Sequence, residues 1–329
     1  MLLFLILHYF TLQGSVGAEK MVQRSPPVMT LVPSINELAE RGGYKATNYE
    51  LITEDGYSIW LHRIGSNSGS PVLIQHGIML AADSWITRGH NKKDLAFMLL
   101  GLGYDVWLSN HRGTFFNEYS TKYNKSNIRF WDFSFHESGI YDLPAAIDKI
   151  LEVRQVEKIF YVGHSLGTAT FAVMCTAKPE YNNKIKAALL MSPVIYLKPI
   201  NRLPLLFQVL GMFKDLIIST FSSSGNYNLG IRTEEFERGL KNVCGEQALT
   251  QHLCLGIIGI LAGENSKNIN KSVKKIADTL PNILVSWPIE DKTFSHLDMV
   301  IGDNANIVLY PHIIKQIESI NKTKMQGKN

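Results

Sequence analysis

The chain of 329 residues carries 45% hydrophobic and 19% charged residues, which is typical of a protein that buries a large core and excludes a disordered chain. The net charge of +4 comes from 33 basic and 29 acidic residues spread along the sequence, without a lysine- or arginine-rich block. We therefore expect no nucleic-acid partner.

The N-terminus has the pattern of a signal peptide. An apolar run over 2–10 is followed by polar and small residues that end at Ala18, the expected last residue removed. The run lacks basic residues ahead of it and is short for a spanning helix, so a membrane anchor is the alternative. We expect domains at 1–18 (signal peptide) and 19–329, and a secreted or lumenal protein.

Alternating strands and helices follow. A capping box at Ser34 and Glu37 opens a short helix that Gly42 and Gly43 stop. A hairpin over 48–64 turns at Asp55-Gly56. Further strands are predicted at 71–75, 104–108, 159–162, 187–191 and 283–287, with helices at 94–102, 142–153 and 310–317. This order predicts an α/β protein with a mainly parallel sheet covered on both faces.

The segment from about 196 to 263 breaks this alternation. It holds two apolar stretches, at 205–210 and 216–218. They are either helices that pack on the main core or a cap whose apolar face meets greasy substrate. Insertion directly after a sheet strand favours the cap.

A nucleophile is predicted at Ser165, in the pattern Gly163-His164-Ser165-Leu166-Gly167. An apolar strand precedes this pentapeptide and a helical stretch follows it, so the serine lies on a strained turn with its hydroxyl pushed outward. The alternative is an ordinary serine in a glycine-rich surface loop. The strand-turn-helix context favours the nucleophile.

A serine nucleophile needs an imidazole base and two donors for the oxyanion. In this architecture the base follows the serine in the chain, which leaves His252, His296 and His312. His252 lies in the presumed cap and His312 within the last helix. His296 follows the predicted strand at 283–287, where ligands meet open α/β sheets, and is the predicted base. The N–H groups of Leu166 and Ile78 are the predicted oxyanion donors.

Three cysteines and three sequons fit an oxidising compartment. Cys244 and Cys254 could close a small disulfide loop, whereas Cys175 is predicted to be a buried free thiol. Their spacing does not fit a zinc site, and neither a metal nor an organic cofactor is expected. Glycosylation sequons begin at Asn124, Asn270 and Asn321.

These motifs resemble the animal acid lipases, the family that includes gastric and lysosomal acid lipase. The resemblance lies in 55–57, 75–77, 103–108, 110–113, 130–134, 163–165 and 296–298, in the family's order. It implies an α/β-hydrolase fold with a helical cap at about 196–263 and a Ser-Asp-His triad that hydrolyses triacylglycerols and cholesteryl esters. It also implies that Ser165 and His296 are catalytic and that Cys244 and Cys254 occupy the cap disulfide positions.

Three departures from the family pattern stand out. Leu166 replaces a common glutamine, which is tolerable if only its backbone N–H is used, and His111 replaces a small residue without an evident chemical consequence. The family's acid lies in a Gly-Gly-x-Asp loop, and this chain lacks that aspartate ahead of Leu280-Pro281-Asn282. Either Asn265 occupies the acid position or several dozen residues, with the acid and its strand, are absent. The shortness of the cap favours the absence.

Several carboxylates could take the place of the acid. Glu264 is the first candidate, since Ser-His-Glu triads exist on this fold. Asp278, Glu290 and Asp291 are other carboxylates within reach in sequence. Loss of the acid's support costs about 10⁴-fold in kcat when an amide replaces it.

Two functions remain open at this point. The chain is either a secreted or lysosomal serine ester hydrolase acting on neutral lipid at an oil–water or membrane interface, or a lipid-binding relative without the acid and with feeble turnover. A shortened form of a longer protein is a third interpretation that the sequence does not separate from the second.

Overall fold

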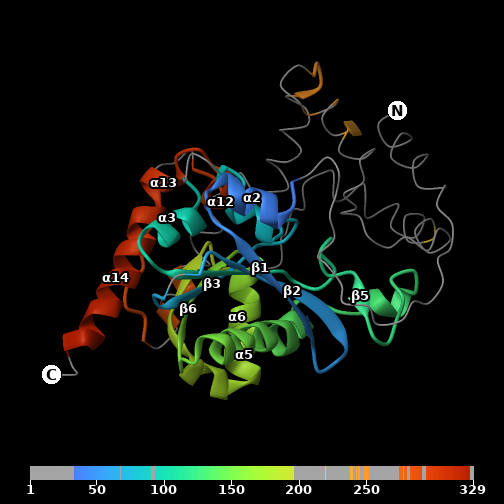
Figure 1. The fold of residues 1–329 in the computed structure, drawn as a ribbon, viewed down its shortest axis with the longest axis horizontal. Helices are drawn as coiled ribbons and strands as arrows, with labels where there is room; N and C mark the ends of the chain where they lie inside the picture. The colour runs from blue at the N-terminus through green and yellow to red at the C-terminus, as the bar shows by residue number, and fades with distance from the viewer. Residues whose placement is uncertain are drawn as a thin grey trace.

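The computed structural model describes residues 33–66, 68–89, 93–195, 282–290 and 294–326, with side chains up to 322, and short pieces between 219 and 279. The predicted signal peptide and most of the predicted cap lie outside the described residues. Within these ranges, one mixed sheet of seven strands forms the centre of the fold (Figure 1).

The sheet has the strand order β1-β2-β4-β3-β6-β7, with the short β5 paired to β2. β1 and β2 form the predicted antiparallel hairpin, and β4, β3, β6 and β7 run parallel to one another. The strands are β1 (Ala46–Ile52), β2 (Tyr57–Ile64), β3 (Pro71–Gln75), β4 (Asp105–Ser109), β5 (Tyr119–Ser120), β6 (Ile159–His164) and β7 (Ile185–Met191).

Helices connect the strands and cover the sheet. The α-helices are α2 (Ile35–Arg41), α3 (Leu95–Gly101), α4 (Phe135–Glu137), α5 (Leu143–Arg154), α6 (Leu166–Ala177), α12 (Asp298–Ile301), α13 (Ala305–Val308) and α14 (Tyr310–Gln326). Short 3₁₀ helices η1 (Ala82–Trp85), η3 (Ile128–Trp131) and η5 (Pro179–Lys184) and a π-helical turn η4 (Ser138–Asp142) complete the described elements.

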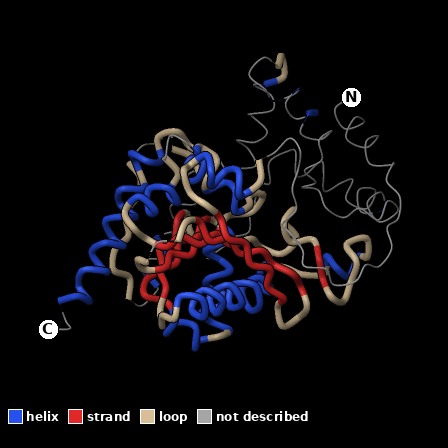
Figure 2. Tube along the Cα trace, in the orientation of Figure 1, coloured by secondary structure: helices blue, strands red, loops and turns tan. Residues whose placement is uncertain are grey.

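Helices α5 and α6 lie on one face of the sheet, and α2, α3 and the C-terminal helices lie on the other (Figure 2). The sequence of β3 shows why both faces are covered, because alternate side chains of a strand point to opposite faces. Val72 and Ile74 are fully buried with α2, α3 and α14, whereas Leu73 is buried with α5 and α6. A strand with apolar side chains at every position thus needs helices on both faces of the sheet to bury them.

The local signals for the first helix and for α5 are confirmed. Ser34 and Glu37 form the capping box of α2, and Gly42 ends it. Pro144 lies in the first turn of α5, where its missing N–H has no helical partner to lose. The last helix is longer than predicted, since α14 runs to Gln326.

The predicted strand at 283–287 is wrong. This segment forms no strand in the described structure, and Ile283, Leu284 and Val285 are 41%, 76% and 46% exposed. An apolar run becomes a strand only if a neighbouring strand accepts its backbone hydrogen bonds. None of the described strands does so here.

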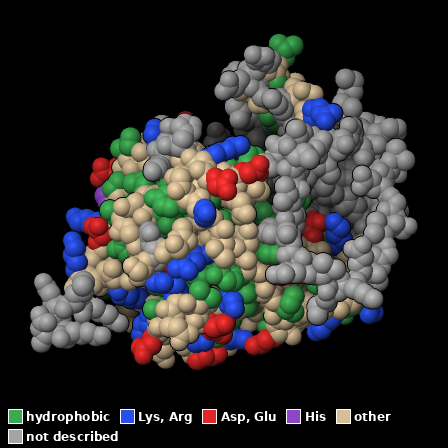
Figure 3. Space-filling model, in the orientation of Figure 1, with side chains coloured by type: hydrophobic (Ala, Val, Ile, Leu, Met, Phe, Trp, Pro, Cys, Tyr) green, Lys and Arg blue, Asp and Glu red, His purple; other side chains and the backbone are tan. Residues whose placement is uncertain are grey.

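The visible surface of the described residues is mixed in character. Acidic, basic and hydrophobic side chains are interspersed over the face shown in Figure 3.

Candidate active site

Ser165 lies between β6 and α6 in the predicted strand-turn-helix context. Its φ of 51° and ψ of −113° place it in a region that a residue with a side chain rarely adopts. An added Cβ on Gly163 would lie 3.1 Å from the carbonyl oxygen of Gly167, and one on Gly167 would lie 2.9 Å from that of Gln75. The turn therefore requires glycine on both sides of Ser165, as the pentapeptide predicted.

The loop after β3 approaches the same turn. An added Cβ on Gly77 would lie 2.9 Å from the Cβ of Ser165 and 2.8 Å from Nδ1 of His164. Leu166 is the first residue of α6, so its N–H is one of the donors that a helix start leaves free. Ile78, the second predicted oxyanion donor, follows Gly77 with its side chain 67% exposed. Leu166 thus directly follows the predicted nucleophile, and Ile78 directly follows the glycine that approaches it.

His111 holds the loop after β3 in place through two hydrogen bonds to His76. The sequence alone indicated no chemical consequence for this departure from the family pattern. The backbone N–H of His111 donates to Nε2 of His76 over 3.2 Å, and its Nε2–H donates to the carbonyl oxygen of His76 over 3.1 Å. His76 in turn donates from Nδ1 to the carbonyl oxygen of Gly77. Burial lowers the pKa of His111 to about 4, so this brace is neutral at physiological pH.

His296 lies beside the nucleophile turn but is not hydrogen-bonded to Ser165. Its Nδ1 lies 2.9 Å from the hydroxyl oxygen of Ser192, which directly follows β7. Its backbone carbonyl oxygen accepts the Nε2–H of His164 over 2.9 Å. Burial lowers the pKa of His296. The structure therefore brings the predicted base, on a loop, to the carboxyl ends of β6 and β7 beside the predicted nucleophile. Catalytic hydrogen bonds often tighten only when substrate binds.

No described carboxylate is hydrogen-bonded to His296. Asp278 and Glu290 are exposed, and the Asp298 carboxylate accepts the backbone N–H of Ser295 over 2.6 Å. Glu264, together with Asn265 and Asp291, lies outside the described residues. Among the described residues, the partner of the imidazole Nδ1 is the hydroxyl of Ser192, which the sequence analysis did not single out.

The loop that carries His296 is anchored by Arg88, which lies between η1 and α3. Arg88 donates from Nη1 to the carbonyl oxygen of Gly302 over 2.7 Å and from Nη2 to that of Val300 over 3.1 Å. Its Nε donates to the buried Asp94 carboxylate over 2.8 Å. α12 begins two residues after His296, so these hydrogen bonds hold the segment that directly follows the loop.

A buried ion-pair network around Arg112 joins the β1–β2 hairpin to the loop after β4 and to the start of α5. Arg112 donates to the carboxylates of Asp142 and Asp55, and its guanidinium lies 4.2 Å from the ring centre of Tyr57. These contacts join the hairpin turn, the loop after β4 and the start of α5.

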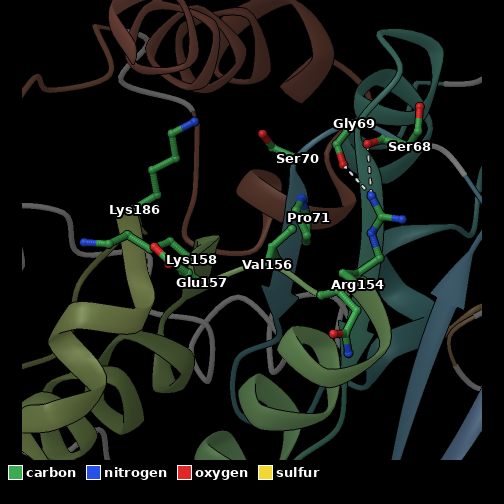
Figure 4. A pocket seen from close by; sticks show the side chains of 10 residues that line it. Ser68, Gly69, Ser70, Pro71, Arg154, Val156, Glu157, Lys158 and Lys186 are labelled. Carbon is green, nitrogen blue, oxygen red and sulfur yellow. Dashed lines mark hydrogen bonds between the residues drawn. The ribbon is translucent and has the colours of Figure 1, made fainter. Parts of the chain in front are cut away.

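A pocket in the structure lies at the wrong end of the sheet for this chemistry. Its lining comes from 68–71, before and at the start of β3, from 154–158, before β6, and from Lys186 at the start of β7 (Figure 4). Ser165 follows the carboxyl end of β6, and β3, β6 and β7 are parallel. The pocket therefore lies at the opposite edge from the nucleophile.

The predicted disulfide and glycosylation sites are only partly described. Cys175 is a free thiol and is half-buried, and burial raises its pKa to about 11. Cys254 and Asn270 lie outside the described residues. Asn124 is exposed in a loop, whereas Asn321 lies within α14, where its side-chain oxygen accepts from Ser70 and Lys186.

In the described part of the chain, none of the helices is both long and apolar enough to cross a membrane. The same part contains no group of three or more His, Cys, Asp or Glu side chains placed to hold a metal ion.

Two family models match the sequence. The partial alpha/beta-hydrolase lipase region matches residues 35–89, and the alpha/beta hydrolase fold matches residues 70–243. The second match covers more than half of the chain and contains Ser165.

Several curated lipases are similar in sequence to most of this chain. Lipase 1 of Drosophila melanogaster is 31% identical over 84% of this chain and 62% of its own length. Human gastric triacylglycerol lipase is 34% identical over 73% of this chain and 60% of its own. A putative lysosomal acid lipase/cholesteryl ester hydrolase of Crotalus adamanteus is 31% identical over 84% and 69%. The chain thus spans about three fifths of the length of the first two relatives.

Among solved structures, an epoxide hydrolase mutant of Vigna radiata aligns with a TM-score of 0.33 and 19% identity, over 52% of this chain and 45% of its own. This likeness is too distant to bear on function.

Proposed function

Because the chain belongs to the α/β-hydrolase fold family, alongside the gastric and lysosomal acid lipases, we propose that it is a serine carboxylic ester hydrolase. Its proposed substrates are neutral lipids, such as triacylglycerols or sterol esters, at an oil–water or membrane interface. The relatives are named as acting on these esters.

In the proposed reaction, Ser165 attacks the ester carbonyl while His296 takes its proton. The oxyanion that forms accepts hydrogen bonds from the N–H groups of Leu166 and Ile78. His296 then protonates the leaving alcohol, and water repeats the sequence on the acyl-enzyme. Glu264, the acid predicted from the sequence, lies outside the described residues, and the proposed reaction does not depend on it. No metal or organic cofactor enters this chemistry.

One observation carries the proposal: Ser165 has a φ of 51° at the end of a central parallel strand, with His296 held beside that turn. Strained backbone of this kind clusters at active sites, where it presents a reactive side chain. A surface loop would have no reason to retain it. A lipid-binding protein without turnover is less favoured, since the relatives compared above are all lipases.

The finer features follow as part of the same proposal. The cap at about 196–263 would carry a disulfide between Cys244 and Cys254. Cys244 is disulfide-bonded and Cys175 is free, which supports this pairing. With a signal peptide at 1–18, the protein would be secreted or lysosomal, and sequons at Asn124, Asn270 and Asn321 would be glycosylated. The exposure of Asn124 supports its modification.

A fluorophosphonate probe tests the proposal directly, because it reacts with an activated serine and not with an ordinary one. We expect labelling of Ser165 in the purified protein, together with hydrolysis of 4-nitrophenyl butyrate and of a triacylglycerol emulsion. Ser165→Ala should lose both. The control is Ser58→Ala, which removes a hydroxyl that binds Glu50 in the hairpin. Absence of both labelling and turnover above the Ser165→Ala level would overturn the proposal.

A further inference from the structure

Ser192 is placed where a triad acid acts. It directly follows β7, the strand beside β6, so it lies at the same edge of the sheet as the nucleophile turn. The backbone N–H of Ser165 donates to the carbonyl oxygen of Met191 over 3.0 Å, which ties the two turns together. On the far side of Ser192, the N–H of Val194 donates to the hydroxyl of Thr168 in α6. The position of Ser192 is therefore fixed by the nucleophile turn and its helix.

The backbone of Ser192 is strained in the same sense as that of Ser165. Its φ is 49°, in the left-handed region that favours glycine. This conformation directs the side chain so that its hydroxyl lies 2.9 Å from Nδ1 of His296. Strain that persists in a non-glycine residue points to a role for its side chain.

The contact decides which nitrogen of His296 can act as a base. Nε2 can take a proton from Ser165 only if the ring's own proton is on Nδ1. A hydroxyl oxygen that accepts from Nδ1–H holds this tautomer and fixes the ring orientation, as a carboxylate does in a Ser-His-acid triad. Unlike a carboxylate, it carries no charge to stabilise the imidazolium that forms.

We infer that Ser192 is the positioning residue of His296: its hydroxyl accepts the Nδ1–H hydrogen bond in place of the carboxylate of an ordinary triad. The inference rests on the proposed ester hydrolysis for its effect on rate. It also predicts that the enzyme is slower than one with a charged acid, and that a carboxylate at position 192 improves it.

Three variants separate the hydroxyl from the backbone strain. Ser192→Gly removes the hydroxyl and suits the positive φ, so we expect unchanged or higher thermal stability with a kcat roughly tenfold lower and KM unchanged. Ser192→Ala should lose activity to the same extent. Ser192→Asp should raise kcat at neutral pH by roughly tenfold or more. It should also move the acid limb of the pH–rate profile to higher pH, because a carboxylate raises the pKa of the base.

A titration of the His296 ring by NMR reads the same contact without turnover. We expect Ser192→Asp to raise the pKa of His296 and Ser192→Gly to lower it, with Ser58→Ala as the unchanged control. Wild-type kcat and pKa in Ser192→Gly would overturn the role of Ser192 while leaving the proposed function intact. Lack of fluorophosphonate labelling in the wild type would instead contradict the proposed function. The titration would still test whether the Ser192 hydroxyl binds Nδ1 of His296.

Discussion

His164 donates its Nε2–H to the backbone carbonyl oxygen of His296 over 2.9 Å, and the two ring centres lie 4.7 Å apart. His164 immediately precedes Ser165, so the turn of the proposed nucleophile itself holds the loop of the proposed base. Burial, and after it the charge interaction with His296, lowers the pKa of His164 to about 3. The ring is therefore neutral at physiological pH, and because its partner is a carbonyl oxygen the ring proton lies on Nε2.

Replacement of His164 by phenylalanine tests this link. His164→Phe keeps a ring of similar shape but has no N–H to donate, so the His296 loop loses one attachment. We expect kcat to fall roughly tenfold, because small misplacements of catalytic groups are costly. Stability should fall by only about 1 kcal/mol, the worth of one hydrogen bond. Steady-state kinetics and urea unfolding measure the two effects. His312→Phe, at an exposed position of α14, is the control, and equal losses in both variants would contradict the link.

The close approach of Gly77 gives a second prediction. A methyl group at this position would lie within 3 Å of Ser165 and His164, so Gly77→Ala must displace either the loop or the nucleophile turn. We expect a loss of roughly 100-fold or more in kcat, the cost of losing an oxyanion donor. Gly101→Ala is the matched control, because an added Cβ there meets nothing within 4 Å. Equal kcat values in the two variants would show that the loop does not serve the oxyanion.

Much of this fold could be predicted from local patterns. The β3 and β6 strands, the capping box of α2 and the turn at Ser165 each depend on neighbours in sequence, and glycine at 163 is required by contacts within that turn. Glycine at 167 is required instead by the close approach of Gln75 at the end of β3. Chain order also leaves few histidines after Ser165, and the structure places His296, the predicted base, beside the turn. Whether that order makes Ser165 and His296 catalytic stays a prediction.

The parts that depend on partners distant in sequence could not be predicted. The contact of Ser192 with His296 spans 104 residues and follows from where β7 ends relative to β6. The brace from His111 to His76 likewise depends on the pairing of β4 with β3. The error at 283–287 has the same origin, since the apolar run is visible in the sequence but the absence of a described partner strand is not.

The Arg88 anchor gives a prediction on stability and activity together. Arg88→Met removes two hydrogen bonds to the segment after His296 and leaves the Asp94 carboxylate buried without its cation. Breaking a buried pair in this way costs about 3–5 kcal/mol. We expect a matching fall in the free energy of unfolding and a lower kcat at temperatures where the variant stays folded. Arg88→Lys keeps the charge and should lose less. Arg129→Met, at an exposed site in η3, should change neither quantity.

Buried histidine makes the fold sensitive to acid, and His62 is the clearest case. It is fully buried, with Nδ1 on the side-chain oxygen of Asn48 and Nε2 near the amide nitrogen of Asn110, and burial lowers its pKa to about 3. In the unfolded chain a histidine titrates near 6.5. Between these two pH values the unfolded state binds the additional proton, so stability falls as pH falls, by about 1.4 kcal/mol per pH unit for this group. We expect His62→Gln to be less stable than the wild type at pH 7 but to show a shallower loss between pH 6.5 and 4, measured by urea unfolding at each pH. His312→Gln should follow the wild-type curve, and an unchanged slope in His62→Gln would show that other groups set the acid limit.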